Sequence, residues 1–458
     1  MQYAVIGAGR SGRSAARLLA EEGHQVLLSD SGRPAEDLAG EYQELELQGV
    51  RLEFDGHSDQ VLSADAILLS PGVSPEIEIV RRGMAKGLLI TNEIEVAGRR
   101  CRGRIIGITG TNGKTTTTEL IGHCCRGAGR EAWVAGNVGT PFSEVAPKVS
   151  PEGIVALELS SFQLEKIETF RPEVAVLLNL TPDHMDRYAT IEEYGAAKLR
   201  IALNMGPEGS LIYNRDDPWL RRIETIDFLP QKRGFSLTES PAVDRQSDLA
   251  AWVDGGRLML SPSPGVEPEM VIDVGEIGIR GPHNLANAMA AALALRSVGL
   301  LPEEIARGLQ SFRPLPHRLE EVGTIDGVLW VNDSKGTNTD ALMQALRSFS
   351  EPIVLIAGGR GKKNDYAPLR PLVRERVRGI VAIGEESDNL VEAFSGDTSV
   401  VRGGTDFRNA LELAASMASP GDVILLSPAC ASFDMFRSFE HRGDVFRELV
   451  RERDGIKP

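Results

Sequence analysis

The stretch Ile108-Thr109-Gly110-Thr111-Asn112-Gly113-Lys114-Thr115-Thr116 decides the fold of this chain. It follows the apolar run Ile105 to Ile108, which is typical of a buried strand, and a helical pattern begins near Thr115. In a loop of this kind the backbone N–H groups wrap phosphate oxygens, and the N-terminus of the helix adds positive potential. Lys114 reaches the outer phosphates and Thr115 can hold Mg²⁺. The sequence therefore predicts a nucleotide-binding loop in a parallel α/β sheet.

The composition places this loop in a large globular protein. Hydrophobic residues make up 42% and charged residues 25% of the 458 positions, which is neither a disordered nor a fibrous composition. The net charge of -15 argues against a nucleic-acid partner, because such a protein presents a basic face to phosphates. No signal-peptide core follows Met1, and no run approaches the roughly twenty apolar residues of a membrane span. We expect a cytoplasmic, monomeric enzyme that acts on small molecules and binds no membrane.

Strand-like and helical runs alternate through three successive units, which predicts an α/β protein of three domains. The first unit, residues 1–97, ends before a charged, glycine-rich segment. The second, residues 98–313, carries the loop above and a polar, proline-rich part from Asp244 to Pro268, which fits either a peripheral β segment or long loops. The third, residues 314–458, begins within the proline-rich run Phe312 to Pro316.

The first domain carries Gly7-Ala8-Gly9-Arg10-Ser11-Gly12 between a strand and a helix, and Asp30 lies at the end of the next strand. This spacing is a dinucleotide-binding fingerprint, in which glycine lets the backbone approach a pyrophosphate at the helix N-terminus. The rest of the ligand stays open, so NAD and a UDP-sugar are equally admissible. Close packing of the helix on the strand, without any ligand, is the alternative explanation.

Polar side chains follow two expected strands of the second domain. Glu158 comes directly after Ile154 to Leu157, where an α/β sheet presents ligands, and an acid there suits a metal that bridges phosphates. His184 follows the next strand end and could face the same metal, although a surface-loop histidine fits the local pattern as well. Lys198 lies in a helical pattern, where local evidence alone favours a solvated lysine.

Three further clusters are weak when taken singly: Gly281 to Asn287, Leu315 to Arg318, and Asn332 to Asn338. The last follows an expected strand and offers donors and charges at the ligand edge of a sheet. Asn284 and Asn287 share a helix face and suit amide contacts to a base. Helix caps and turns also explain each of these clusters adequately.

In this order, the clusters resemble the Mur ligase family over nearly the whole chain. The loop from Thr109 to Thr116 looks like the family's ATP loop, Gly281 to Asn287 like its adenine-side motif, and Leu315 to Arg318 like its interdomain motif. The resemblance implies an N-terminal Rossmann-like domain for a UDP-linked precursor and a central P-loop ATPase-like parallel sheet. It also implies a C-terminal Rossmann-like domain that binds the amino acid and closes on ATP.

Within the family, four segments favour the branch that adds D-glutamate: Gly7 to Gly12, Ser70-Pro71-Gly72, Asn332 to Asn338 and Ser427 to Asp434. The branch that adds L-alanine usually has histidine where Asn112 stands. The resemblance thus implies an ATP-dependent amide ligase that joins D-glutamate to UDP-N-acetylmuramoyl-L-alanine through an acyl phosphate. That reaction belongs to cytoplasmic peptidoglycan precursor synthesis.

The resemblance also gives individual residues a role in metal binding and catalysis. A pair of Mg²⁺ ions would be held by Thr115, Glu158, His184 and Lys198. Lys198 would act after carbamylation by CO₂, which turns a cation into an anionic oxygen ligand. Lys114, His184 and Lys198 are the expected catalytic residues.

Further residues are expected to bind the substrates on the same ground. Those expected to bind ATP are Gly110, Thr111, Asn112, Gly113, Lys114, Thr115, Thr116, Asn284, Asn287, Arg318, Asp333 and Lys335. Those expected to contact the UDP-linked substrate are Gly9, Ser11, Gly12, Asp30, Ser70, Gly72, Asn137 and Ser160. Those expected to surround D-glutamate are Thr337, Lys362, Ser432 and Phe439. A second lysine, Lys363, follows Lys362, so either of the two fits the glutamate carboxylate.

Three other functions remain open at this point. One is another amino-acid ligase of the same superfamily, such as the L-alanine-adding enzyme or a folylpolyglutamate synthase, although Ser427 to Asp434 argues against both. Another is a nucleotide-gated binding protein, in which ATP closes domains without ligation. The last is an NAD-dependent oxidoreductase built on Gly7 to Gly12, for which the phosphate-binding loop leaves little room.

Overall fold

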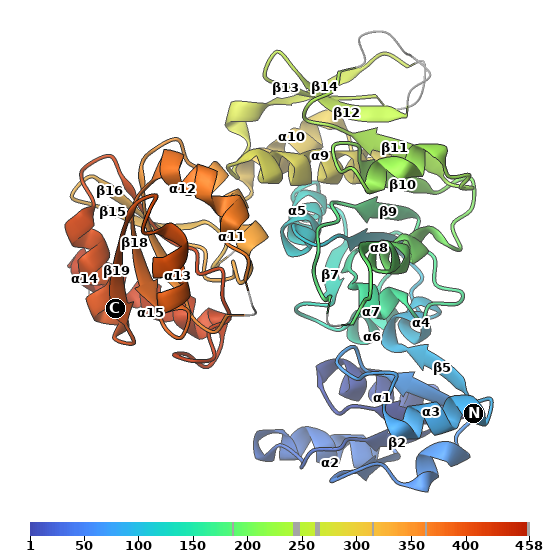
Figure 1. Ribbon diagram of the computed structural model, residues 1–458. Coiled ribbons are helices and arrows are strands. Elements are labelled where there is room, and N and C mark those ends of the chain that lie inside the picture. The colour runs from blue at the N-terminus through green and yellow to red at the C-terminus, as the bar shows by residue number, and fades with distance from the viewer. Residues whose placement is uncertain (186, 241–247, 262–265, 314–315, 362–363, 456–458) are drawn as a thin grey trace. The chain divides into compact units, whose positions relative to one another are not determined.

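The protein is described here by a computed structural model (Figure 1). The residues that the structure describes are 1–185, 187–240, 248–261, 266–313, 316–361 and 364–455. The chain forms two compact units, one of residues 1–277 and 286–312 and the other of residues 278–285 and 313–458. The expected boundary between residues 97 and 98 falls inside the first unit and stays a prediction. Within the described residues, no helix is long and apolar enough to cross a membrane.

The N-terminal sheet of the first unit is parallel, with the strand order β3-β2-β1-β4-β5. Its elements are β1 (Gln2–Ile6), α1 (Arg10–Glu21), β2 (Gln25–Ser29), α2 (Ala39–Leu47), β3 (Val50–Glu53), β4 (Ala66–Leu69), α3 (Glu78–Ala85) and β5 (Leu89–Asn92). Successive side chains of a strand point to opposite faces, so Tyr3 and Val5 pack with α1 and α2, whereas Ala4 and Ile6 pack with α3. The strand order reverses at β1, which puts the loop from Gly7 to Gly12 at a topological switch point.

The central sheet, also in the first unit, has the strand order β14-β13-β12-β11-β10-β9-β6-β8-β7. Its parallel strands are β6 (Arg104–Thr109), β7 (Ala132–Gly136), β8 (Ile154–Glu158), β9 (Val174–Leu177), β10 (Ser210–Asn214) and β11 (Gln231–Phe235). The helices that accompany them are α5 (Lys114–Gly127), α6 (Phe142–Val145), α7 (Ser161–Leu164), α8 (Ile191–Leu199), α9 (Pro282–Ser297) and α10 (Pro302–Ser311). The carboxyl ends of parallel strands share one edge, so the loop after β6 lies beside the residues that follow β8 and β9.

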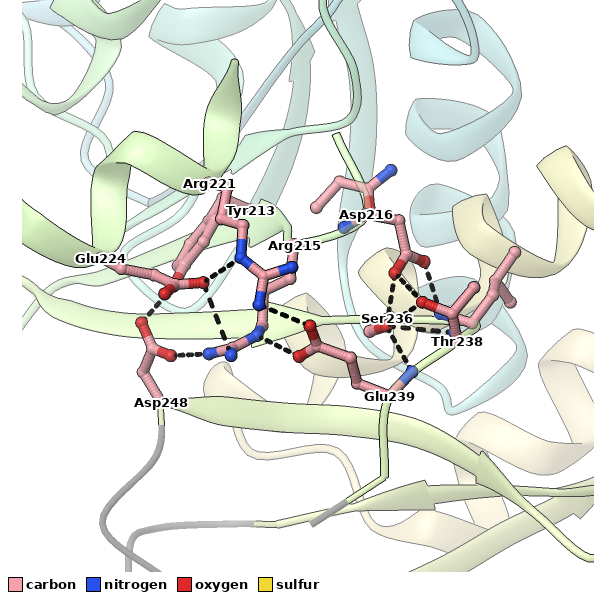
Figure 2. Close-up of polar contacts among 11 residues, drawn as sticks. Tyr213, Arg215, Asp216, Arg221, Glu224, Ser236, Thr238, Glu239 and Asp248 are labelled. Atoms are coloured by element: carbon pink, nitrogen blue, oxygen red, sulfur yellow. Dashed lines mark hydrogen bonds and ion pairs between the residues drawn. The ribbon is translucent and has the colours of Figure 1, made fainter. Parts of the chain in front are cut away.

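An antiparallel extension completes this sheet, which settles the choice between a β segment and long loops. Strands β12 (Leu249–Asp254), β13 (Arg257–Leu260) and β14 (Glu269–Asp273) form it, and β12 pairs with β11. A polar cluster ties the extension to the exits of β10 and β11 (Figure 2). The Arg215 guanidinium lies 2.9 Å from Glu239 and 3.5 Å from Glu224, and it also contacts Asp248 just before β12. These ion pairs hold the extension against the rest of the sheet, which is a structural role.

Helix α4 (Glu93–Gly98) joins the two sheets of the first unit through buried carboxylates. The Ser143 N–H donates to Glu93 Oε1 at 2.6 Å. The Glu95 carboxylate accepts the N–H groups of Glu168, Thr169 and Phe170 at 2.9 to 3.1 Å. Burial raises the pKa of Glu93, which is 1% exposed, to about 7. These carboxylates therefore help to join the two sheets, and they accept hydrogen bonds from backbone N–H groups that would otherwise have no partner.

The second unit contains a sheet of strand order β15-β16-β20-β17-β18-β19, parallel except at its β15 edge. Its strands are β15 (Glu320–Ile325), β16 (Val328–Asn332), β17 (Ile353–Gly358), β18 (Val377–Ile383), β19 (Ser399–Gly404) and β20 (Val423–Leu426). Its helices are α11 (Thr339–Arg347), α12 (Arg370–Arg376), α13 (Ser387–Phe394), α14 (Phe407–Met417) and α15 (Phe439–Arg453). Helices α11, α12 and α13 cover one face and α14 and α15 the other, as in a Rossmann-like sheet.

Candidate functional site

The phosphate-binding loop needs its glycines for backbone reasons. Gly110 and Gly113 have φ angles of +150° and +83°, which favour glycine over residues with a side chain. A Cβ on Gly113 would lie 2.4 Å from Asn287 Oδ1. Helix α5 begins at Lys114, one residue before the expected start, and its N-terminal N–H groups face the loop. The geometry is that of a loop which receives an anion at a helix N-terminus.

A neighbouring segment holds this loop in place. Asn112 N–H donates to Asn179 Oδ1 at 2.8 Å, and Asn179 Nδ2 donates to the Asn112 carbonyl at 3.0 Å. Thr111 N–H donates to the Asn179 carbonyl at 3.0 Å. Asn179 has no role among the sequence-based expectations, although its place as a polar residue after the apolar run of β9 is a signal that points to it.

Two lysines converge on the same loop carbonyl. The Nζ atoms of Lys114 and Lys198 each donate to the Gly110 carbonyl at 2.9 Å. Lys198 is 2% exposed, so the solvated position favoured by its local sequence is wrong. Burial, with a smaller effect of the Lys114 charge, lowers the pKa of Lys198 well below the ordinary lysine value. This environment disfavours the charged form of the Lys198 amine.

Glu158 ends β8 next to these lysines and is 2% exposed. Its Oε1 accepts Asn137 Nδ2 at 3.1 Å, and its carbonyl accepts the Asn137 N–H at 2.9 Å. Within the described residues, no group of three or more His, Cys, Asp or Glu side chains is placed to hold a metal ion. Mg²⁺ fits such a site, because it takes one or two carboxylates and completes its shell with water and substrate phosphates. Glu158 and Thr115 offer the oxygen ligands that this requires.

His184 lies in the loop after β9, with a φ of +56° and a half-exposed side chain. Its ring packs edge-on against Phe162 at 4.9 Å between centroids, and Tyr194 is 6.3 Å away. Its Nε2 lies 3.6 Å from Asp183 Oδ2. An aromatic wall therefore holds the imidazole at the same sheet edge as the phosphate-binding loop, while leaving it accessible.

The N-terminal glycine loop is braced from two sides. Asp30 accepts the Ala8 N–H at 2.6 Å, and Ser70 Oγ donates to the Gly7 carbonyl at 2.8 Å. A Cβ on Gly12 would lie 1.9 Å from the Gly7 oxygen, so α1 can approach the loop only without a side chain there. Gly9 directly precedes α1, and a Cβ there would meet nothing within 4 Å. Asp30, Ser70 and Gly12 therefore each help to hold the shape of this loop.

The remaining residues expected at the UDP-linked substrate are spread over both sheets of the first unit. Ser11 lies in the first turn of α1, and Gly72 is exposed after β4. Asn137 is exposed after β7, where it contacts Glu158. Ser160 caps α7: its Oγ accepts the Gln163 N–H, and Gln163 Oε1 accepts the Ser160 N–H. Ser160 is half-buried at the same sheet edge.

The second unit gathers its expected residues at the carboxyl end of β16 and β20. Asp333 is buried, and burial raises the pKa of its carboxyl to about 7, while Ser427 Oγ donates to its Oδ2 at 2.7 Å and the nearby Arg318 charge opposes the shift. The Lys335 Nζ lies 5.2 Å from the centre of the Phe439 ring. Asn284 Nδ2 donates to the Arg280 carbonyl at 2.8 Å at the start of α9.

The described residues that are expected to bind D-glutamate lie after β16 and between β20 and the start of α15. Thr337 is half-buried between β16 and α11, and Ser432 is buried after β20, ahead of Phe439 at the start of α15. Lys362 and Lys363 lie outside the described residues. A residue without an expected role, Arg442, is fully buried and braces these loops, because its guanidinium donates to Ser334 and to the Cys430 carbonyl.

Comparisons with known proteins cover almost the whole chain. The Mur ligase MurD-like N-terminal domain matches residues 1–92, the Mur ligase middle domain residues 108–295, and the Mur ligase glutamate ligase domain residues 317–430. A UDP-N-acetylmuramoylalanine--D-glutamate ligase from Salinibacter ruber is 45% identical over 97% of this chain and 96% of its own length.

Solved structures of related ligases share the fold. The UDP-N-acetylmuramate-alanine ligase of Thermotoga maritima superposes with a TM-score of 0.60 at 16% identity, covering 100% of both chains. A MurF ligase from the same organism, solved in complex with ADP, gives a TM-score of 0.59 at 17% identity over 93% of this chain and 95% of that one. At such identities the likeness concerns architecture alone.

Proposed function

Since the chain belongs to the Mur ligase family, we propose that it joins D-glutamate to UDP-N-acetylmuramoyl-L-alanine with ATP, as a step of peptidoglycan precursor synthesis. The observation that carries this function is the meeting of a phosphate-binding loop, a buried carboxylate and a buried lysine at one sheet edge. Relatives with 40 to 45% identity over nearly the full chain bear the name of this ligase.

ATP is bound by the loop from Gly110 to Thr116 and by Asn287, whose amide lies against Gly113. Lys114 is placed to exchange its carbonyl partners for phosphate oxygens, because its Nζ already lies within the loop. Asn284, Arg318, Asp333 and Lys335 are assigned to the nucleotide as well. Mg²⁺, as a pair of ions, supplies charge neutralisation for the phosphates when it is bound.

Lys198 would add CO₂ and lose a proton to form a carbamate, and Thr115, Glu158, His184 and this carbamate would hold Mg²⁺. Its buried amine supports this assignment, because only a neutral amine attacks CO₂ and burial suppresses the charged form. The product is an anionic oxygen donor, which suits a hard cation better than an amine does. Glu158 and the carbamate would both offer oxygen ligands to the metal.

The reaction proceeds in two displacements. The alanine carboxylate of the UDP-linked substrate attacks the γ-phosphorus, the bond to the bridging oxygen of ADP breaks, and an acyl phosphate forms. The neutral amine of D-glutamate then attacks the acyl carbon, and phosphate leaves with one oxygen of the original carboxylate. Lys114 and the α5 N-terminus stabilise charge in the first displacement.

The N-terminal glycine loop binds the UDP-linked substrate. Gly9 leaves the α1 N-terminus open for a pyrophosphate, and Ser11, Gly12, Asp30, Ser70 and Gly72 shape that loop, whereas Asn137, Ser160 and His184 serve the muramoyl end. Thr337, Lys362, Ser432 and Phe439 bind D-glutamate. The enzyme acts in the cytoplasm as a monomer on these small molecules alone.

Isotope transfer tests the acyl-phosphate mechanism. UDP-N-acetylmuramoyl-L-alanine with ¹⁸O in the alanine carboxylate is turned over with ATP and D-glutamate, and the released phosphate is analysed by mass. One labelled oxygen per phosphate is expected, because the C–O bond of the acyl phosphate breaks in the second displacement. Unlabelled phosphate together with amide product would contradict the mechanism.

A further inference from the structure

The segment from Leu178 to Thr181, which we call the strap, leaves β9 and runs beside the phosphate-binding loop. Five hydrogen bonds join Thr111 and Asn112 of the loop to the strap. Asn179 accounts for three of them: two between its amide and the Asn112 peptide, at 2.8 and 3.0 Å, and one from Thr111 N–H to its carbonyl at 3.0 Å. The Thr111 hydroxyl makes the other two, with the Thr181 carbonyl and N–H, both at 3.1 Å.

The strap is itself anchored on its far side, by the exit of β10. Asn214 Nδ2 donates to the Leu178 carbonyl at 3.1 Å, and Leu180 N–H donates to Asp217 Oδ2 at 2.6 Å. Asp217 is 7% exposed and also accepts the N–H groups of Trp219 and Leu220. The loop is therefore tied, through the strap, to the next strand of the sheet rather than to its own flanking strand and helix alone.

We propose that Asn179 is a positioning residue for ATP, whose side-chain amide clamps the Asn112 peptide and fixes the phosphate-binding loop in its receiving conformation. An amide suits this position, because it meets an N–H with an oxygen and a carbonyl with an N–H. The two partners also fix which way the amide points. A loop held before binding loses less conformational entropy when the nucleotide arrives.

The strap also connects the phosphate-binding loop to the proposed metal site. It continues through Pro182 and Asp183 to His184, which the proposed function assigns to the metal and the muramoyl end of the substrate. Thr111 also reaches Tyr194, with 3.5 Å between the two hydroxyl oxygens, and the Tyr194 ring lies 4.4 Å from Lys198 Nζ. A shift of the strap would therefore move the nucleotide site and the metal site together. The assignment of Asn179 rests on the proposed function.

The test replaces Asn179 by alanine and by aspartate. Asn179→Ala removes both contacts to the Asn112 peptide. Asn179→Asp keeps an acceptor for the N–H but loses the donor and sets a negative charge against a carbonyl and the phosphates. The affinity for ADP with Mg²⁺ is measured by calorimetry, and KM for ATP and for D-glutamate by phosphate release. ADP affinity should fall about tenfold in both variants, as the loss of one or two net hydrogen bonds implies, and KM for ATP should rise while KM for D-glutamate stays unchanged.

Asn204 supplies a matched control. Its Nδ2 donates to two backbone carbonyls, those of Glu168 and Phe170, at 2.9 and 3.0 Å, away from the loop. Asn204→Ala should lower the melting temperature by a similar amount and leave ADP affinity as it is. Wild-type ADP affinity in both Asn179 variants would overturn the clamp and leave the proposed function standing, as would an equal loss in Asn204→Ala. A wild-type protein that binds no ADP would overturn the proposed function and the clamp together.

Discussion

Lys114 and Lys198 point their ammonium nitrogens at one atom, the carbonyl oxygen of Gly110, at the same distance of 2.9 Å. Two positive charges cannot share such a site cheaply when one of them is buried. Lys198 is the buried member, and its pKa is lowered by burial first and by Lys114 second. The charged form of Lys198 is therefore disfavoured, and the proposed function assigns a phosphate contact to Lys114 and a reaction with CO₂ to Lys198.

Depletion of CO₂ should lower the activity. We expect the rate of phosphate release to fall in degassed, CO₂-free buffer and to recover when bicarbonate is added, because the carbamate of Lys198 reverts to the amine. The measurement is a coupled phosphate assay with both substrates present. A rate that is independent of CO₂ after long incubation would contradict carbamylation.

Replacement of Lys198 by methionine should stabilise the free protein while it abolishes activity. Lys198 has a lower pKa in the folded protein than in the unfolded chain, so the wild-type free energy of unfolding declines as pH drops below the ordinary lysine value. Methionine removes that cost, and we expect a gain of about 1 kcal/mol at neutral pH, which grows at lower pH. Urea unfolding at several pH values checks this, and a destabilised variant would be the opposite result.

Glu93→Gln should remove a pH dependence of stability. The folded pKa of Glu93, about 7, lies above its ordinary value, so its contribution to stability is fully present below the ordinary value and is lost as pH rises through 7. The glutamine keeps an oxygen for the Ser143 N–H and cannot ionise. We expect the variant to match the wild type near pH 5 and to exceed it by up to about 3 kcal/mol above pH 8. The free energy of unfolding of both proteins is measured as a function of pH. The same change with pH in the two proteins would argue against a raised pKa of Glu93.

Alanine substitutions at Gly12 and Gly9 distinguish a packing role from a ligand-binding role. Gly12→Ala places a Cβ 1.9 Å from the Gly7 oxygen and should cost about 1 to 3 kcal/mol of stability. Gly9→Ala has open space and an ordinary φ of -64°, so its melting temperature should stay near that of the wild type. KM for the UDP-linked substrate should rise in Gly9→Ala all the same, because the Cβ enters the space proposed for the pyrophosphate. An unchanged KM would remove Gly9 from that site.

The fold was predictable where a pattern is local. The apolar runs give β6, β8 and β9 nearly to the residue, and the glycine spacing gives the loop before α5. The α/β class is confirmed. The sequence does not distinguish the antiparallel extension from long loops, because its short strands lie in polar and proline-rich sequence. The extension is ordered by the pairing of β12 with β11.

The candidate site was predictable only in its outline. Lys198 looks like a solvated helix lysine by sequence, since its burial depends on elements far away along the chain. Asn179, Arg442 and Glu93 carry contacts that join distant segments, and no spacing rule along the chain reveals such partners. The loop, Glu158 and the two lysines do meet at one edge, whereas the substrate roles of single residues stay predictions.

The proposed ligation is tested by phosphate release from ATP with UDP-N-acetylmuramoyl-L-alanine and one of three amines, D-glutamate, L-glutamate or L-alanine. We predict release with D-glutamate alone, in step with amide product. Release with L-alanine or L-glutamate in place of D-glutamate would contradict the assigned substrate, and release with no amine at all would contradict ligation.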